Sequence, residues 1–260
     1  MTLRGRLATL KALWRSVRVY HLDRDHHRAM DALYGRFVRP GGLVFDIGAH
    51  VGDRVSSFRR LGARVVALEP QPGPAAVIRL IHGRDRNVTL LRAAAGPQAG
   101  EIVLHVNSRN PTVSTASPDF VAAADGAGGW EGQVWDERIT VPLVTLDGLV
   151  AEHGVPDFVK VDVEGFEDSV LAGLSTPVPA LSFEFTTIAR DVAGRCIVRI
   201  SELGPYRFNV AMGESQRMSF PEPIDGPAMR SYLDGLPHDA NSGDVYAILP
   251  PAGGSSGSAP

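Results

Sequence analysis

Short apolar runs alternate with helical stripes of apolar residues along most of this chain. Residues 43–47 form an apolar run after two glycines, which is typical of a buried strand. Just after that run, Val51, Val55 and Phe58 fall on one helical face, and Gly62 is placed to end the helix. The same patterns predict strands at residues 64–68, 88–94, 101–106, 138–144, 158–163, 180–185, 206–212 and 245–249, and helices at 51–61, 74–81, 146–152 and 165–172.

This alternation predicts an α/β fold, with a parallel sheet and helices on its faces. We assign residues 41–250 to one domain, after a helical extension at 1–40 and before a tail at 251–260 whose Gly and Ser content predicts disorder. Residues 107–137 interrupt the alternation and are rich in Asn, Ser, Pro, Gly and Ala. A segment this long inside a domain is usually a lid or a binding loop, so we expect it to be mobile and to border a pocket.

The N-terminal extension is basic and amphipathic. Its apolar stripe consists of Leu3, Leu7, Leu10, Trp14 and Val17. We interpret it as a helix packed across the domain, because most amphipathic helices cover a core. The alternative is a weak contact with a membrane surface or a partner helix.

Composition narrows the function classes. The net charge of −3 over 260 residues gives no general case for nucleic-acid or membrane binding. Cys196 is the single cysteine, which fits a reducing compartment. No apolar run approaches the length of a membrane helix, and the first residues lack the apolar stretch of a signal peptide. We therefore expect a cytoplasmic protein.

A glycine turn follows the first expected strand and carries the first chemical signal. It reads Asp46-Ile47-Gly48-Ala49-His50-Val51-Gly52-Asp53. Open α/β sheets bind nucleotides at the carboxyl end of this strand. Asp46 stands where a dinucleotide motif has its first glycine, and Asp53 would repel a pyrophosphate at the helix start. An acidic turn suits a positively charged ligand without phosphate, and S-adenosylmethionine is such a ligand.

Glu69-Pro70 closes the second expected strand, about twenty residues after the first motif. A carboxylate in this place can accept hydrogen bonds from both hydroxyls of a ribose. Taken by itself, Glu69 would be better explained as a surface residue at a strand end. Its distance from the glycine turn favours a cofactor contact, and we expect Ala94, at the end of the third strand, to contribute another.

The third signal is the acid-rich end of the strand expected at 158–163. With a period of two, Lys160, Asp162 and Glu164 fall on one side of it. Helix capping would explain Glu167, but Asp162 comes too early in the chain to cap the next helix. We therefore expect these acids at the carboxyl, ligand-binding edge of the sheet.

The ordered set of motifs resembles the FkbM methyltransferase family. It consists of Phe45-Asp46-Ile47-Gly48-Ala49-His50-Val51-Gly52, Leu68-Glu69-Pro70, Val144-Thr145-Leu146-Asp147, Val159-Lys160-Val161-Asp162-Val163-Glu164-Gly165 and Phe183-Glu184. The resemblance spans roughly residues 41–190. It implies a class I methyltransferase fold with a mostly parallel seven-stranded sheet, S-adenosylmethionine as cofactor, and O-methylation of hydroxyls on sugars or polyketide-type natural products.

Methyl transfer to a hydroxyl needs alignment and a base. Asp162 is our first candidate for the base and Glu184 our second, with Glu164 beside them; His50 sits inside the cofactor loop and is better explained as structural. Acids near a sulfonium need no metal, so we expect none, although these three acids could alternatively hold a divalent ion. The rival functions are a cofactor-binding module without catalysis and a Rossmann oxidoreductase.

Overall fold

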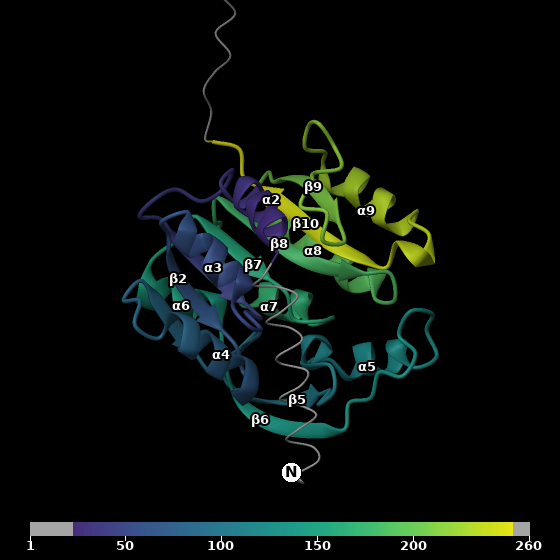
Figure 1. Cartoon of the computed structure of the whole chain (residues 1–260). Helices are drawn as coiled ribbons and strands as arrows, with labels where there is room; N and C mark the ends of the chain where they lie inside the picture. The colour runs from purple at the N-terminus through teal and green to yellow at the C-terminus, as the bar shows by residue number, and fades with distance from the viewer. Residues whose placement is uncertain (1–22, 252–260) are drawn as a thin grey trace, which may run out of the picture.

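A twisted sheet with helices on both faces forms the body of the molecule in the computed structural model, which describes residues 23–251 (Figure 1). The seven-stranded sheet has the order β3-β2-β1-β7-β8-β10-β9. Its strands are β1 (Leu43–Ile47), β2 (Arg64–Leu68), β3 (Val88–Leu91), β7 (Phe158–Val161), β8 (Ala180–Thr186), β9 (Arg207–Met212) and β10 (Ser242–Ile248). Only β10 runs antiparallel to its neighbours, so the sheet is mostly parallel.

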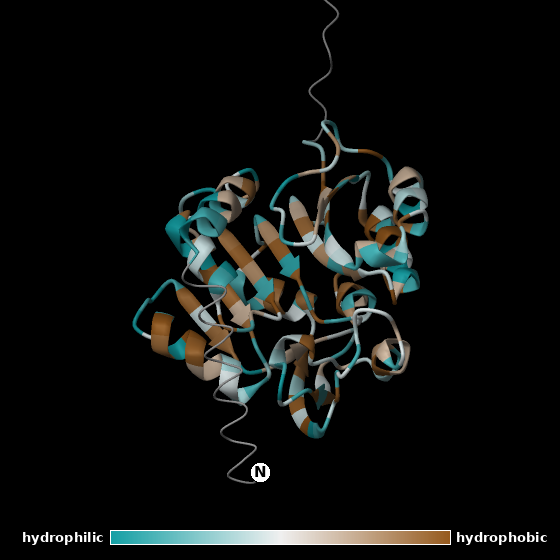
Figure 2. Cartoon of the chain, turned by 45° about the vertical axis from the view of Figure 1, so that its right-hand side comes forward, coloured by the Kyte–Doolittle hydropathy of each residue, from teal (hydrophilic) through white to brown (hydrophobic). Residues whose placement is uncertain are grey.

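Alternate side chains of the strands belong to two apolar clusters, one on each face of the sheet. Phe45 and Val159 face the helices α6 (Leu146–His153), α7 (Glu167–Ala172), α8 (Arg190–Leu203) and α9 (Gly226–Asp234). Val44 and Phe158 face α2 (Arg24–Tyr34), α3 (Asp53–Arg60) and α4 (Pro72–His82). Figure 2 shows the apolar character of the central strands. Because both faces are covered, these strands read as nearly continuous apolar runs.

Polar residues nevertheless occur in these strands, and they fall on the α2–α3 side. Each polar residue lies two positions from an apolar member of that cluster, and so on the same face of the sheet: Asp46 from Val44, Lys160 from Phe158 and Asp244 from Tyr246. Asp46 pairs with Lys160 in register, and Asp244 pairs with Glu184. The register therefore gathers the charged side chains toward the carboxyl ends of the parallel strands.

A separate three-stranded sheet, ordered β4-β6-β5, corrects one expectation. The strand expected at 88–94 is split into β3 and β4 (Ala94–Ala95), and β4 pairs with β6 (Glu137–Val144). β6 also pairs antiparallel with β5 (Gly100–Val106). The apolar pattern shows that residues 88–94 are extended, but it does not show that the chain changes sheets at Arg92-Ala93.

The segment 107–137 is more ordered than the expectation of a bare loop. It contains a 3₁₀ turn, η1 (Pro111–Val113), and a short helix, α5 (Pro118–Ala124). Phe120 and Trp130 are buried in the main core and contact each other edge to face. Three aromatic residues in a Gly-rich segment were the signal for this packing. Whether the segment moves remains a prediction.

Helices α8 and α9 were not anticipated, although Val192, Cys196 and Ile200 are spaced for one helical face of α8. A further 3₁₀ turn, η2 (His238–Ala240), precedes β10. The amphipathic stripe from Leu3 to Val17 lies outside the described residues. None of the helices within residues 23–251 is long and apolar enough to cross a membrane.

Candidate active site

A cavity opens at the carboxyl ends of β1, β2 and β7, and it collects most of the residues that the sequence singled out. Among the expected residues, it is lined by Asp46, Gly48, Ala49, His50, Asp53, Glu69, Pro70, Ala94, Asp162, Glu164 and Glu184. Gly52 is set apart from this lining: it precedes α3 with φ +80°, as the helix N-cap. The expected motifs, distant in sequence, therefore meet around one space.

The turn after β1 depends on Gly48. Its φ is +86°, and a Cβ there would lie 1.8 Å from the Asp162 carbonyl oxygen. No side chain fits at that distance, so glycine is required where the β1 turn crosses the end of β7. The glycine turn and the acid-rich segment are thus in direct contact.

Glu69 is fixed by the backbone of its surroundings. Its Oε2 accepts from the His50 N–H at 2.8 Å and its Oε1 from the Gln71 N–H at 2.8 Å. Burial raises the pKa of Glu69 to about 8, although both hydrogen bonds act to lower it. Each carboxylate oxygen retains a second acceptor position that could serve a ligand in the cavity.

Asp46 differs from Glu69, because its Oδ2 is buried with no hydrogen-bond partner among the described residues. The side chain is 1% exposed, and burial raises its pKa to about 7. A cation or a donor from a ligand would supply the missing partner.

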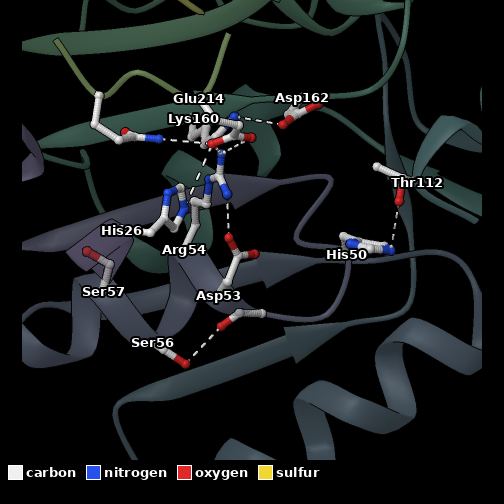
Figure 3. A network of polar contacts seen from close by, with 12 residues as sticks. His26, His50, Asp53, Arg54, Ser56, Ser57, Thr112, Lys160, Asp162 and Glu214 are labelled. Carbon is white, nitrogen blue, oxygen red and sulfur yellow. Dashed lines mark hydrogen bonds and ion pairs between the residues drawn. The ribbon is translucent and has the colours of Figure 1, made fainter. Parts of the chain in front are cut away.

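Two buried cations compensate part of the acidity (Figure 3). Arg54 contacts Asp53 and, at 2.8 Å, the Glu214 carboxylate. Lys160 lies 2.8 Å from Asp162 Oδ2 and 3.3 Å from Asp244 Oδ1. The sequence analysis did not predict Glu214 or Asp244 here, because their placement depends on how β10 pairs with β8 and β9.

Asp162 and Glu184 have opposite electrostatics. Burial would raise the pKa of Asp162, but the Lys160 ammonium outweighs it and holds that pKa below its ordinary value. Burial and the neighbouring carboxylates of Glu164 and Asp162 raise the pKa of Glu184 well above its ordinary range. β7 ends at Val161, so Asp162 lies just beyond it, whereas Glu184 lies within β8 and not at its end.

Glu164 occupies an unusual turn. Its φ is +57°, which costs free energy for a residue other than glycine. The Thr115 hydroxyl donates to its carbonyl at 2.6 Å, and Glu167 accepts from the Val163 and Gly165 N–H groups at 3.1 Å. Side chains from the 107–137 segment and from α7 therefore hold this turn in place.

The three acids Asp162, Glu164 and Glu184 come together in the cavity. One carboxylate oxygen from each lies within 4.8 Å of the other two. His50 lines the same cavity, with Nε2 3.4 Å from the Thr112 hydroxyl (Figure 3). This arrangement gives a cavity in which three carboxylates lie close together.

Comparison with known proteins gives these motifs a family. The sequence model of the methyltransferase FkbM domain matches residues 46–233. The chain belongs to this family. Its seven-stranded sheet with helices on both faces is the class I methyltransferase architecture that the sequence predicted.

Two curated relatives were found for this FkbM-domain chain. It is 29% identical to "31-O-demethyl-FK506 methyltransferase FkbM" of Streptomyces tacrolimicus over 162 residues, covering 54% of this chain and 62% of that protein. It is 26% identical to "Hexuronic acid methyltransferase AglP" of Haloferax volcanii over 163 residues, covering 61% and 60%. The chain thus spans about six tenths of the length of these relatives.

Solved structures of other methyltransferases superpose on most of the chain with low TM-scores. A precorrin-6y C5,15-methyltransferase from Geobacter metallireducens is 14% identical, with a TM-score of 0.44 and coverage of 88% of this chain and 89% of that one. An O-methyltransferase from Bacillus cereus, solved with SAH, is 10% identical, with a TM-score of 0.43 and coverage of 96% and 92%.

Proposed function

We propose that this FkbM-domain chain transfers a methyl group from S-adenosylmethionine to a hydroxyl of a saccharide or a polyketide-type natural product. The observation that carries the proposal is the placement of the glycine turn and the three-acid group Asp162, Glu164 and Glu184 in one cavity. Family membership supports methyl transfer, and the names of the two relatives support a natural-product or sugar acceptor.

The turn after β1 and the end of β2 would hold the methyl donor. Glu69 has acceptor positions for the ribose hydroxyls, and its two backbone hydrogen bonds fix its direction. Asp46 offers a buried oxygen without a partner to the positively charged amino-acid part of the cofactor. The same cavity is also lined by His50, Pro70 and Ala94. These residues would contact the cofactor by van der Waals packing.

The reaction is an in-line displacement. The acceptor oxygen attacks the methyl carbon, the carbon–sulfur bond breaks with its electron pair going to sulfur, and the hydroxyl proton leaves to a base. Asp162 is ionised beside Lys160 and would accept a hydrogen bond from the hydroxyl, orienting it. Glu184 has the higher proton affinity and would take the proton, because a base works best when its pKa approaches the working pH.

Cofactor binding would prepare Glu184 for that role. The raised pKa reflects crowded, buried negative charge, and a sulfonium cation placed nearby stabilises the ionised carboxylate. The donor would therefore bring the base toward its active, unprotonated form.

The proposal is tested in two stages. Calorimetry should show binding of S-adenosylhomocysteine and none of NAD. A panel of saccharide and polyketide acceptors is then incubated with labelled S-adenosylmethionine, and mass spectrometry locates the added methyl group. Binding of NAD without any response to S-adenosylhomocysteine would refute the proposal, as would cofactor binding without transfer to any hydroxyl acceptor.

A further inference from the structure

The rest of the protein satisfies the acids Asp162, Glu164 and Glu184 unequally, because Asp162 pairs with Lys160 whereas neither glutamate has an ion pair among the described residues. Glu164 is 7% exposed, and within residues 23–251 neither a hydrogen bond nor an ion pair reaches its carboxylate. Glu184 Oε2 is buried and also lacks a hydrogen-bond partner there. A buried carboxylate without a partner is costly, so this group is built for something that the protein itself does not supply.

We propose that Asp162, Glu164 and Glu184 form a binding site for a divalent cation. Oxygen-only ligands suit hard cations such as Mg²⁺, Mn²⁺ and Ca²⁺. Two oxygens on one Mg²⁺ can be at most about 4.2 Å apart, and two on one Ca²⁺ at most about 4.8 Å. The three oxygens lie within 4.8 Å of one another, so small side-chain shifts would bring all three onto one ion.

Local charge favours a divalent over a monovalent ligand. Asp162, Glu164 and Glu184 carry three negative charges when ionised, and the adjacent ammonium is Lys160. Lys160 already divides its contacts between Asp162 and Asp244. One positive charge that is shared with a fourth carboxylate cannot neutralise three acids, and the negative charge that remains favours a divalent ion.

The surrounding structure holds the acids in place without using up their oxygens. Lys160 contacts Asp162 through Oδ2. Thr115 and Glu167 hold the turn around Glu164 through its backbone and that of its neighbours, leaving the Glu164 carboxylate uncommitted. Since these contacts orient the acids, they resemble the outer partners that support metal ligands.

This inference rests on the proposed function, in which an ion here would bind and polarise the acceptor hydroxyl. Each acid would give the ion one oxygen, so the second oxygen of Glu184 stays available to take the proton. The binding itself is tested without acceptor or cofactor. Mn²⁺ is titrated into the full chain, and the electron paramagnetic resonance signal of free Mn²⁺ is followed. We expect one ion per chain, with a dissociation constant of roughly 10⁻³ M or tighter, displaced by Ca²⁺ or Mg²⁺.

Two variants test whether the ion binds at these residues. Glu164→Gln and Glu184→Gln keep the side-chain shape and remove its charge, so each should weaken Mn²⁺ binding by about tenfold or more. Glu101→Gln, an exposed acid on β5, is the matched control and should leave binding unchanged. Circular dichroism establishes that each variant is folded, and either Gln variant is sufficient if the other does not fold.

The outcomes separate this site from the proposed function. Absence of Mn²⁺ binding, or binding of wild-type strength in both Gln variants, overturns the cation site. Full methyl transfer by a chain that binds no Mn²⁺ overturns it too, while the proposed function stands. Mn²⁺ binding that requires Glu164, in a chain that binds no S-adenosylhomocysteine, supports the cation site and refutes the proposed function.

Discussion

Glu69 and Glu164 are both buried acids in one cavity, yet the fold treats them differently. Glu69 accepts two backbone hydrogen bonds, so its direction is built by the protein. Glu164 is held in a strained turn, and its carboxylate receives no hydrogen bond from the described residues. The contrast separates the half of the cavity around Glu69, an acid that the protein orients before a ligand arrives, from an incomplete half around Glu164, an acid that a ligand must satisfy.

The largest effect should come from removing charge in the incomplete half. Glu184→Gln keeps the shape of the side chain but cannot take a proton, so kcat should fall by about 10²–10⁴-fold. The dissociation constant of S-adenosylhomocysteine should change little, and single-turnover kinetics with calorimetry would measure both. A variant with undiminished kcat would show that Glu184 is not the base.

Lys160→Met tests how the incomplete half is held. The change removes the buried ammonium that pairs with Asp162 and Asp244 and leaves both acids without it. Breaking a buried pair on one side typically costs about 3–5 kcal/mol, so the free energy of unfolding should drop by that order. Urea denaturation measures it. A loss no larger than that of the exposed-site variant Glu101→Gln would contradict the buried network.

Glu69→Ala probes the half that the protein completes. The lost acceptors for the ribose should weaken S-adenosylhomocysteine binding by roughly 1.5–3 kcal/mol, reduced where water replaces the carboxylate. Calorimetry gives the dissociation constant, and Glu152→Ala, an exposed acid on α6, provides the control. If the folded Glu69 variant binds as tightly as that control, the residue only supports its own turn.

The most gradual expected effect is on pH dependence, because it is spread over several pH units. Burial raises the pKa of Asp46 to about 7 and of Glu69 to about 8. Carboxyls in an unfolded chain titrate near 4, so the folded protein binds more protons between those limits. The stabilising contribution is fully present below about pH 4 and is lost as pH rises through about 7 and 8.

We therefore expect the free energy of unfolding of the ligand-free chain to decrease between about pH 5 and pH 9 from these two groups. Urea denaturation across that range measures the slope, and Asp46→Asn should make it shallower. An equal slope in the variant would assign the effect to other groups.

The sequence predicted the central sheet well because its strands are buried on both faces and read as continuous apolar runs. It also located the ligand edge, because chemically distinctive residues end β1, β2 and β7. It could not place Asp244 or Glu214, since an acid near the end of an antiparallel pair acquires neighbours only through the register of β8, β10 and β9. The sequence also did not predict that the chain changes sheets after β3, because that change depends on the pairing of β4 with β6.

Residues 107–137 teach the opposite lesson, because their composition did not predict that they would be partly buried. Gly, Ala and Pro made residues 107–137 look loose, but a Cβ on Gly165 would lie 2.4 Å from the Phe120 ring. Phe120 thus packs against the turn that carries Glu164. A few aromatic residues in a polar segment outweighed its average composition.

The contact between Gly48 and the Asp162 carbonyl limits how this protein can be re-engineered. At that crossing the turn that faces the donor and the turn that presents the acids share one van der Waals surface. A larger residue at position 48 would displace both turns together. At that crossing, donor recognition cannot be altered without also moving the acids. Changes of acceptor preference are therefore best sought elsewhere, as at Ser242, which lines the cavity from β10.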